Sequence, residues 1–406
     1  MLRSALLSLA IVLSPLLPHA ALADDAFVAA FQDRLAAADL QGAATLAQAR
    51  ISADSTDRQA WFALGAAQFL QAVEGLGQDL YDHGLVHPVV VSGFGPTISD
   101  LPFLRFPVPE NPAPTPLTPQ ALRDIVSRFN SQLLTAEATL AQVPKGALSL
   151  PLDVQRIALD YDQDGKAAAT ESLPFLIAAI ANVELRPKFP VVGFDESDVP
   201  WLRGYAHLLA GITDSLLAYD FSQTVEQTFH AAFPQSDLPS SPLNAQVESL
   251  ERQYAENRTQ EGDCWDYSYD PYDSVTSPEE AADTERRESC VTARTALEYG
   301  SLADVIAFIH LMRWPVTEPA RLLTAREHFL SMIALSRESW ALILGETDDQ
   351  AEWVPGPKQT SLFPRMRVDD RILAGWMDFL DQAEGVLEGR LLLPHWRFDR
   401  SQGVNL

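Results

Sequence analysis

Basic side chains, cysteines and long apolar segments are all scarce in this sequence. Lys and Arg together number 29 against 55 Asp and Glu, so the formal net charge is −26. Nucleic-acid binding needs clusters of Lys and Arg that contact phosphates, and no such cluster is visible. Nucleic acids and anionic membrane surfaces are therefore disfavoured as partners. We interpret the acidic surface as a solvated one that keeps the protein soluble.

The most apolar segment lies at the N-terminus. An apolar run from Ala5 to Leu17 follows Arg3, and Ala21-Leu22-Ala23 precedes Asp24. The run is too short to span a bilayer, and the small residues that follow it are typical of a secretory signal peptide, residues 1–23. We expect cleavage after Ala23, a periplasmic or secreted location, and no membrane insertion, because no later segment is long and apolar enough.

Only two cysteines are present, Cys264 and Cys290. They lack the spacing of a thiolate metal pair and have no nearby histidine, which argues against a metal or catalytic role. Export to an oxidising compartment favours a disulfide between them. The bridge would restrain the acidic, aromatic segment 263–273, and in the chain-entropy model a loop of this size gains about 3 kcal/mol of stability.

Recognisable catalytic motifs are also missing. The sequence contains no His-Glu-x-x-His motif, no Gly-x-Ser-x-Gly elbow and no phosphate-binding loop. His83 and His87 adjoin Gly84 and Pro88, where a helical metal-binding face is not expected. His207 and His310 lie in apolar helical segments, so we interpret them as hydrogen-bonded core residues.

One acidic residue has a setting that a glycan hydrolase would use. Glu338 is close to Trp340 in the sequence, which fits a carboxylate in an aromatic cleft, but the sequence does not locate the second acid that this chemistry needs. An exposed Arg337–Glu338 surface is the favoured interpretation.

Residues 160–171 carry the clearest chemical signal in the chain. They read Asp-Tyr-Asp-Gln-Asp-Gly-Lys-Ala-Ala-Ala-Thr-Glu, with three alternating acids, a glycine and a closing glutamate. Calcium takes about six to eight oxygen ligands, and a loop of this length can wrap them around one centre. The segment resembles the calcium loop of EF-hand proteins. The resemblance implies a Ca²⁺ site whose ligands are Asp160, Asp162, Asp164, the backbone carbonyl of Lys166, and Glu171, with Gly165 at the sharp turn.

The loop departs from the EF-hand pattern at three points. Ala167 stands where a branched aliphatic residue is usual, and Pro174 follows Glu171 closely, where the next helix should begin. A second loop is also missing, since residues 195–198 lack the glycine and the spacing and are better interpreted as a helix N-terminus. The alternative to a calcium loop is an exposed acidic Asp-Gly turn.

Helical periodicity dominates the rest of the chain, and strand alternation is scarce, so we predict an all-α fold. Residues 57–65 resemble the first helix of a tetratricopeptide repeat (TPR), in which Trp61, Leu64 and Gly65 have the expected spacing, and Phe27 precedes Trp61 by the 34-residue repeat period. An ordinary antiparallel helix pair is the alternative.

The expected organisation has five parts. They are a signal peptide (1–23), a TPR-like helical region (24–100), a Pro-rich connector (101–119), a helical region with the EF-hand-type loop (120–235), and a C-terminal helical region with a disulfide loop at 264–290 (236–406). The connector has seven prolines between Pro102 and Pro119 and cannot be helical. Thr118 and Pro119 predict the next helix start. Later helices are predicted at 175–180, 201–216, 277–299, 317–344 and 368–387.

These patterns favour a secreted or periplasmic calcium-binding protein without enzymatic activity. We expect the ion to fix local structure, because a calcium sensor normally couples two loops. The helices would then serve a binding or scaffolding role toward a protein or peptide. The alternative is a secreted, for example glycan-directed, hydrolase on the same helical scaffold.

Overall fold

The computed structural model describes most of the chain in several stretches. They are residues 25–86, 102–181, 191–229, 232–236, 238, 313–346, 351–352, 354–356, 359–361, 368–391, 393–394 and 403–404. The predicted signal peptide, the cysteine pair and the predicted helix at 277–299 lie outside these residues, as do His87 and His310.

The described residues are mostly helical. Their α-helices are α1 (Asp25–Ala36), α2 (Leu40–Ala53), α3 (Arg58–Asp82), α4 (Pro119–Leu140), α5 (Leu173–Ala181), α6 (Asp198–Leu217), α7 (Ser222–Thr228), α10 (Pro319–Ile343) and α11 (Asp370–Leu387). Short 3₁₀ helices are η2 (Pro102–Arg105), η3 (Val154–Arg156) and η4 (Ala169–Glu171). The helices predicted from periodicity in these stretches are confirmed.

Short strands modify the predicted all-α class. Antiparallel β1 (Leu150–Leu152) and β2 (Val192–Phe194) pair with each other, as do parallel β3 (Ala351–Glu352) and β4 (Thr360–Ser361), and antiparallel β5 (Leu393–Pro394) and β6 (Gly403–Val404). Each strand has two or three residues, which is too few for side-chain alternation to show in the sequence.

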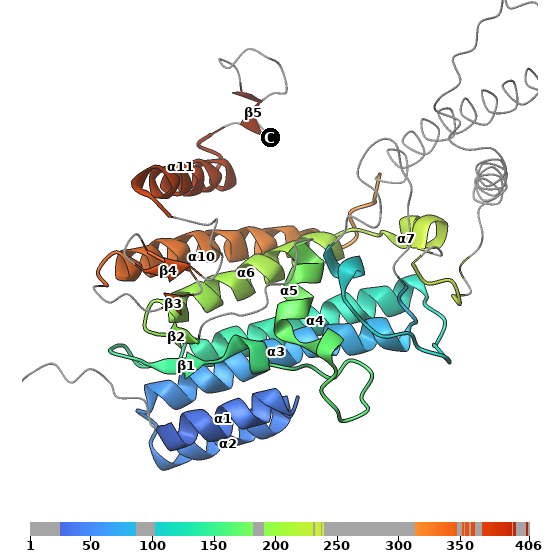
Figure 1. Ribbon diagram of the computed structural model, residues 1–406. Helices are drawn as coiled ribbons and strands as arrows, with labels where there is room; N and C mark the ends of the chain where they lie inside the picture. Colours follow the sequence, from blue (N-terminus) through green and yellow to red (C-terminus); the bar gives the residue numbers. More distant parts are fainter. Residues whose placement is uncertain are drawn as a thin grey trace, which may run out of the picture.

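The long helices lie side by side in one layer (Figure 1). α3 packs against α4, α4 against α6, and α6 against α10, while α2 packs against α3, α1 against α2, and α11 against α10. Small residues bring α6 close to α10: a side chain at Gly204 would meet Leu335, and one at Gly211 would overlap the ring of Phe329. None of the helices in the described stretches combines the length and apolarity that a membrane span requires.

Polar caps explain where several of these helices begin. The side chain of Asp57 accepts a hydrogen bond from the amide of Ala60 at the start of α3. Thr118 accepts one from the amide of Ala121, with Pro119 in the first turn of α4, as predicted. Each cap satisfies an amide that has no partner within its own helix.

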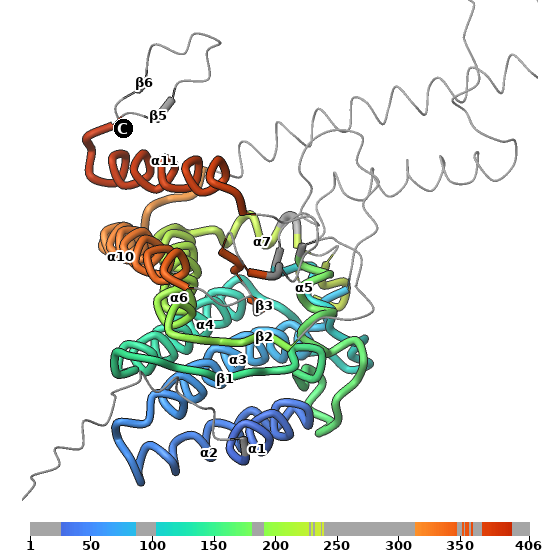
Figure 2. The backbone as a smooth tube through the Cα atoms, turned by 60° about the vertical axis from the view of Figure 1, so that its left-hand side comes forward, coloured from blue at the N-terminus to red at the C-terminus, as the bar shows by residue number. Residues whose placement is uncertain are grey.

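Irregular segments cover one face of the helix layer. The predicted non-helical connector is wrong at its start, where Pro102–Arg105 form one short 3₁₀ turn, η2. Residues 106–118 contain no helix, and the side chains of Leu104, Phe106 and Leu117 are buried on the core. The β1–β2 pair crosses the same face (Figure 2), with Leu150 opposite Phe194 and Leu152 opposite Val192. This pair connects the segment before the acidic loop with the entry to α6.

The contact between Gly77 and Tyr161 sets how closely the acidic loop approaches α3. Tyr161 is fully buried, and a methyl group added at Gly77 would lie 2.2 Å from its ring. We therefore expect Gly77→Ala to destabilise the protein by about 2–3 kcal/mol, as overpacking does, measured by denaturant unfolding.

Gly75→Ala, two residues away in the same helix, is the matched control. An added methyl group there would meet only the flexible end of Gln132, so the higher helix propensity of alanine should leave stability unchanged or raise it by up to about 1 kcal/mol. Equal effects of the two substitutions would show that the Tyr161 contact does not set the packing.

Candidate metal centre

Backbone hydrogen bonds close the two ends of the acidic loop. The amide of Leu159 donates to the carbonyl of Glu171 at 2.9 Å, and the amide of Leu173 donates to the carbonyl of Ile157 at 2.9 Å. Ala158 and Ser172 form an antiparallel bridge between these bonds. The loop therefore projects from a fixed base.

Three aspartates converge inside the loop. Each of Asp160, Asp162 and Asp164 places one carboxylate oxygen so that all three oxygens lie within 4.8 Å of one another. Asp160 and Asp162 are half-buried, and Asp164 is exposed. Like charges at this separation repel each other, and a bound cation would relieve that repulsion.

Loop amides hold these carboxylates in place. Asp160 accepts hydrogen bonds from the amides of Asp164 and Gly165, both at 3.1 Å, and Asp162 accepts one from the amide of Asp164 at 3.1 Å. Gly165 has φ of +75° with open space around it, so glycine is required there for its backbone conformation. Gln163 is also left-handed, with φ of +59°.

Lys166 supplies a positive charge at the edge of the loop. Its Nζ lies 2.6 Å from Oδ2 of Asp164, and its amide donates to Oδ1 of the same residue at 2.8 Å. The lysine hydrogen bond lowers the pKa of Asp164. The lysine side chain is 79% exposed, so a metal ion can displace it from the carboxylate without disrupting the core.

Glu171 lies at the closing end of the loop and is 2% exposed. Its carboxylate accepts hydrogen bonds from the amides of Tyr161, at 2.9 Å, and Ala168, at 3.3 Å. Burial raises its pKa, and the charge of Asp162 acts in the same direction, while the backbone amides act against this change. The three-aspartate group does not include this carboxylate.

Two polar residues of α3 support the loop from behind. The carboxylate of Glu74 accepts a hydrogen bond from the amide of Asp160 at 3.0 Å, and Nε2 of Gln78 donates to the Asp160 carbonyl at 2.8 Å. Burial raises the pKa of Glu74 to about 7, and the charges of Asp160 and Glu171 add to the effect. A cation in the loop would oppose this rise, because it favours the charged carboxylate.

Sequence reasoning identified the loop but missed Glu74 and Gln78. The available signal is two polar residues spaced i, i+4 in α3, but nothing in the sequence shows that they face a segment more than 80 residues away. The concern about Pro174 is resolved, because this residue lies in the first turn of α5, where proline is tolerated.

Other predicted candidates lie away from the loop. Asp198 begins α6, as predicted for that acidic segment, and accepts a hydrogen bond from the amide of Asp195. Glu338 is 50% exposed and lies 3.9 Å from Nζ of Lys145, which agrees with the surface interpretation. The Nδ1 atom of His83 contacts the Thr115 carbonyl at 2.9 Å.

No protein-family model matches the chain, and no curated protein and no solved structure is significantly similar to it.

Glu74 predicts a pH dependence of stability in the chelated protein. A pKa of about 7 in the folded state lies above the value of 4.5 for a free glutamate. The stability that its protonated form contributes is therefore fully present below about pH 4.5 and is lost as the pH rises through 7. Relative to wild type, we expect Glu74→Gln to gain on the order of 1–2 kcal/mol between pH 5 and pH 8, after allowing for solvent screening.

Urea unfolding at both pH values, with chelator present, measures this difference. The matched control is Glu110→Gln, a glutamate in the segment between η2 and α4, which should show no such gain. A pH-independent offset in Glu74→Gln would contradict the raised pKa.

Proposed function

We propose that the loop of residues 160–171 binds one calcium ion. The observation that carries the proposal is the convergence of three carboxylate oxygens within 4.8 Å of one another on a loop whose ends are closed by backbone hydrogen bonds. The converging donors are all carboxylates. Hard oxygen donors suit Ca²⁺, whereas copper and zinc sites normally recruit histidine or cysteine.

The EF-hand resemblance supplies the finer assignment. In this proposal Asp160, Asp162 and Asp164 each contribute a carboxylate, and the carbonyl of Lys166 and the carboxylate of Glu171 complete the coordination. The burial of Glu171 at the closing end of the loop supports its inclusion. The ion would displace the Lys166 ammonium group from Asp164.

We assign a structural role to the ion. The base of the loop is already fixed by hydrogen bonds from Glu74 and Gln78 on α3 and by the buried ring of Tyr161. An ion at a site with a rigid base can tighten the loop. Among the described residues the loop has no paired second loop to move, as a calcium sensor requires.

The location and the wider role extend this proposal. The N-terminal sequence supports export, and calcium sites in extracellular proteins typically have dissociation constants of about 10⁻⁴–10⁻³ M. The TPR-like spacing near Trp61 supports a scaffolding role of the N-terminal helices toward a protein or peptide. The surface position of Glu338 gives no support to the hydrolase alternative.

Calorimetry tests the ligand assignment. We expect the purified chain to bind one Ca²⁺, and Asp162→Asn and Glu171→Gln each to weaken binding by about 10-fold or more, because each removes an anionic ligand. Lys166→Gln should strengthen binding by about two- to fivefold, because it removes a competing ammonium group and keeps the backbone carbonyl.

Asp124→Asn is the control for the loss of one negative charge. Asp124 is exposed on α4 and its carboxylate accepts a hydrogen bond from Gln120, so the substitution should leave calcium affinity unchanged. If Asp124→Asn and Asp162→Asn weakened calcium binding equally, the loss of affinity would be an effect of overall charge and not of a lost ligand. Failure of the wild-type chain to bind calcium would refute the proposal.

A thermal shift experiment separates a structural ion from a sensory one. An ion that binds only the folded state adds about 2.7 kcal/mol at a hundredfold excess over its dissociation constant. We expect calcium to raise the melting temperature of wild type and not that of Asp162→Asn. Binding of a hydrophobic dye should not increase. A calcium-dependent increase in dye binding, with secondary structure unchanged, would instead identify a switch.

A further inference from the structure

A second cluster of titratable groups lies between α4, α6 and α10, away from the acidic loop. At its centre, Nδ1 of His207 on α6 lies 2.8 Å from Nδ1 of His328 on α10. The two side chains are only 14% and 12% exposed. The prediction that His207 is a hydrogen-bonded core residue holds for the hydrogen bond, whose partner is a second histidine, but the residue is partly buried and does not belong to the core.

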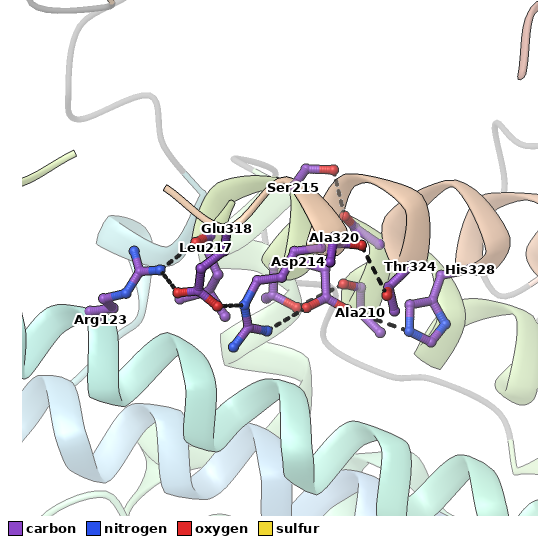
Figure 3. Close-up of polar contacts among 12 residues, drawn as sticks. Arg123, Ala210, Asp214, Ser215, Leu217, Glu318, Ala320, Thr324 and His328 are labelled. Atoms are coloured by element: carbon purple, nitrogen blue, oxygen red, sulfur yellow. Dashed lines mark hydrogen bonds and ion pairs between the residues drawn. The ribbon is translucent and has the colours of Figure 1, made fainter. Parts of the chain in front are cut away.

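A carboxylate faces the outer nitrogen of each ring. Nε2 of His207 lies 3.5 Å from Oε1 of Glu137 on α4, and Nε2 of His328 lies 3.5 Å from Oδ2 of Asp214 on α6. Figure 3 shows the second end, where Asp214 reaches from α6 toward His328 on α10. These are ion-pair contacts, and each favours a proton on the outer nitrogen.

Arginines neutralise both carboxylates. Arg203 on α6 bonds to Glu137 at 2.9 Å, and Arg321 on α10 bonds to Asp214 at 2.7 Å. Beyond Arg321 the chain of charges continues through Glu318, which precedes α10, to Arg123 on α4. With both histidines neutral, the three arginines and the three acids of this network balance, so any extra charge must come from the imidazoles.

The proton positions on the two rings decide what the close Nδ1 atoms do. If each ring carries its proton on the outer nitrogen, toward its carboxylate, then both Nδ1 atoms are bare. Two bare nitrogens at 2.8 Å repel each other unless a cation lies between them. The separation fits an N–H···N hydrogen bond.

The separation does not fit a metal ion. Two imidazole nitrogens on a tetrahedral metal lie about 3.4 Å apart. Among the described residues, the group of three or more metal-ligand side chains that converges is the aspartate triad, and neither histidine belongs to it.

We propose that His207 and His328 hold one excess proton between their Nδ1 atoms at neutral pH and form an acid-sensitive latch between α6 and α10. In the latched state one ring is an imidazolium that donates to the other, neutral ring. Each outer N–H then lies near a carboxylate, in an ion-pair contact at 3.5 Å, although Nε2 of His328 has no hydrogen-bond partner among the described residues.

A second proton would break the latch. Both Nδ1 atoms would then carry hydrogen and face each other inside an interface in which Gly204 and Gly211 already allow close contact with Leu335 and Phe329. Burial lowers the pKa of His328, and the charge of His207 lowers it further, while Asp214 and Glu137 act in the opposite direction. A lowered pKa means that this stability is present above the ordinary histidine range and is lost as the pH falls.

Nitrogen NMR of the purified chain, labelled at histidine and saturated with calcium, tests the proposal. Two-bond ¹⁵N correlations distinguish an imidazolium from a neutral ring. At pH 7.5 we expect one imidazolium and one neutral Nε2–H ring from this pair, and a second imidazolium only when the pH is lowered. Two neutral rings or two charged rings at pH 7.5 would overturn the proposal, and this outcome needs no variant.

Variants and metal addition sharpen the test. His328→Phe keeps a ring of similar shape but removes the acceptor, so the imidazolium signal at pH 7.5 should disappear. His83→Gln is the matched control and should leave it unchanged. Adding Co²⁺ in the presence of calcium should not alter the signals of the pair. Stoichiometric Co²⁺ binding that His328→Phe abolishes would identify a metal site and refute the shared proton.

Thermal melting between pH 8 and pH 5 measures the latch itself. The melting temperatures of wild type and of His83→Gln should decrease more from pH 8 to pH 5 than that of His207→Phe. The reason is that only the intact histidine pair opposes a second proton. Parallel pH profiles for all three proteins would show that the pair does not act as a latch.

Discussion

The fully buried ring of Tyr161, seated against Gly77, is the contact on which the candidate metal centre depends. This contact fixes Tyr161, the second residue of the acidic loop, against α3. Asp160 and Asp162 on either side of Tyr161 then lie close together. The phenol oxygen has no hydrogen-bond partner among the described residues, a loss of about 1–3 kcal/mol. The burial of the aromatic ring offsets this loss. The loop is therefore positioned by packing.

Local patterns predicted the parts of the structure that depend on neighbouring residues. Thr118 and Pro119 specified the start of α4, and the alternating acids after Leu159 specified the three converging carboxylates. The supporting residues on α3 were not predictable, because Glu74 meets Asp160 only through the tertiary fold. The same limit applies to the histidine pair. His207 has the signature of a core residue, and its partner lies 121 positions later in the sequence.

The β1–β2 pair connects the segments that carry the two candidate sites. β1 precedes the acidic loop, and β2 leads directly into α6, which carries His207 and Asp214. Positive charge has opposite consequences at the two places. At the loop a cation relieves repulsion among carboxylates that have few positive neighbours, whereas at the interface of α6 and α10 the acids are already matched by arginines. The histidine pair at this interface therefore accepts one additional proton but not a second.

Helix α1 contacts a segment that is synthesised much later. The amide of Ala158 donates to the carbonyl of Leu35, and the amide of Asp153 donates to Gln32 across 121 positions of the chain. Such non-local contacts raise the contact order and slow folding, because the intervening chain must be ordered before they form. During synthesis α1 stays without these partners until residue 158 has emerged. A fragment that ends earlier would lack these partners of α1, the helix that carries the fully buried Phe31 and Leu35.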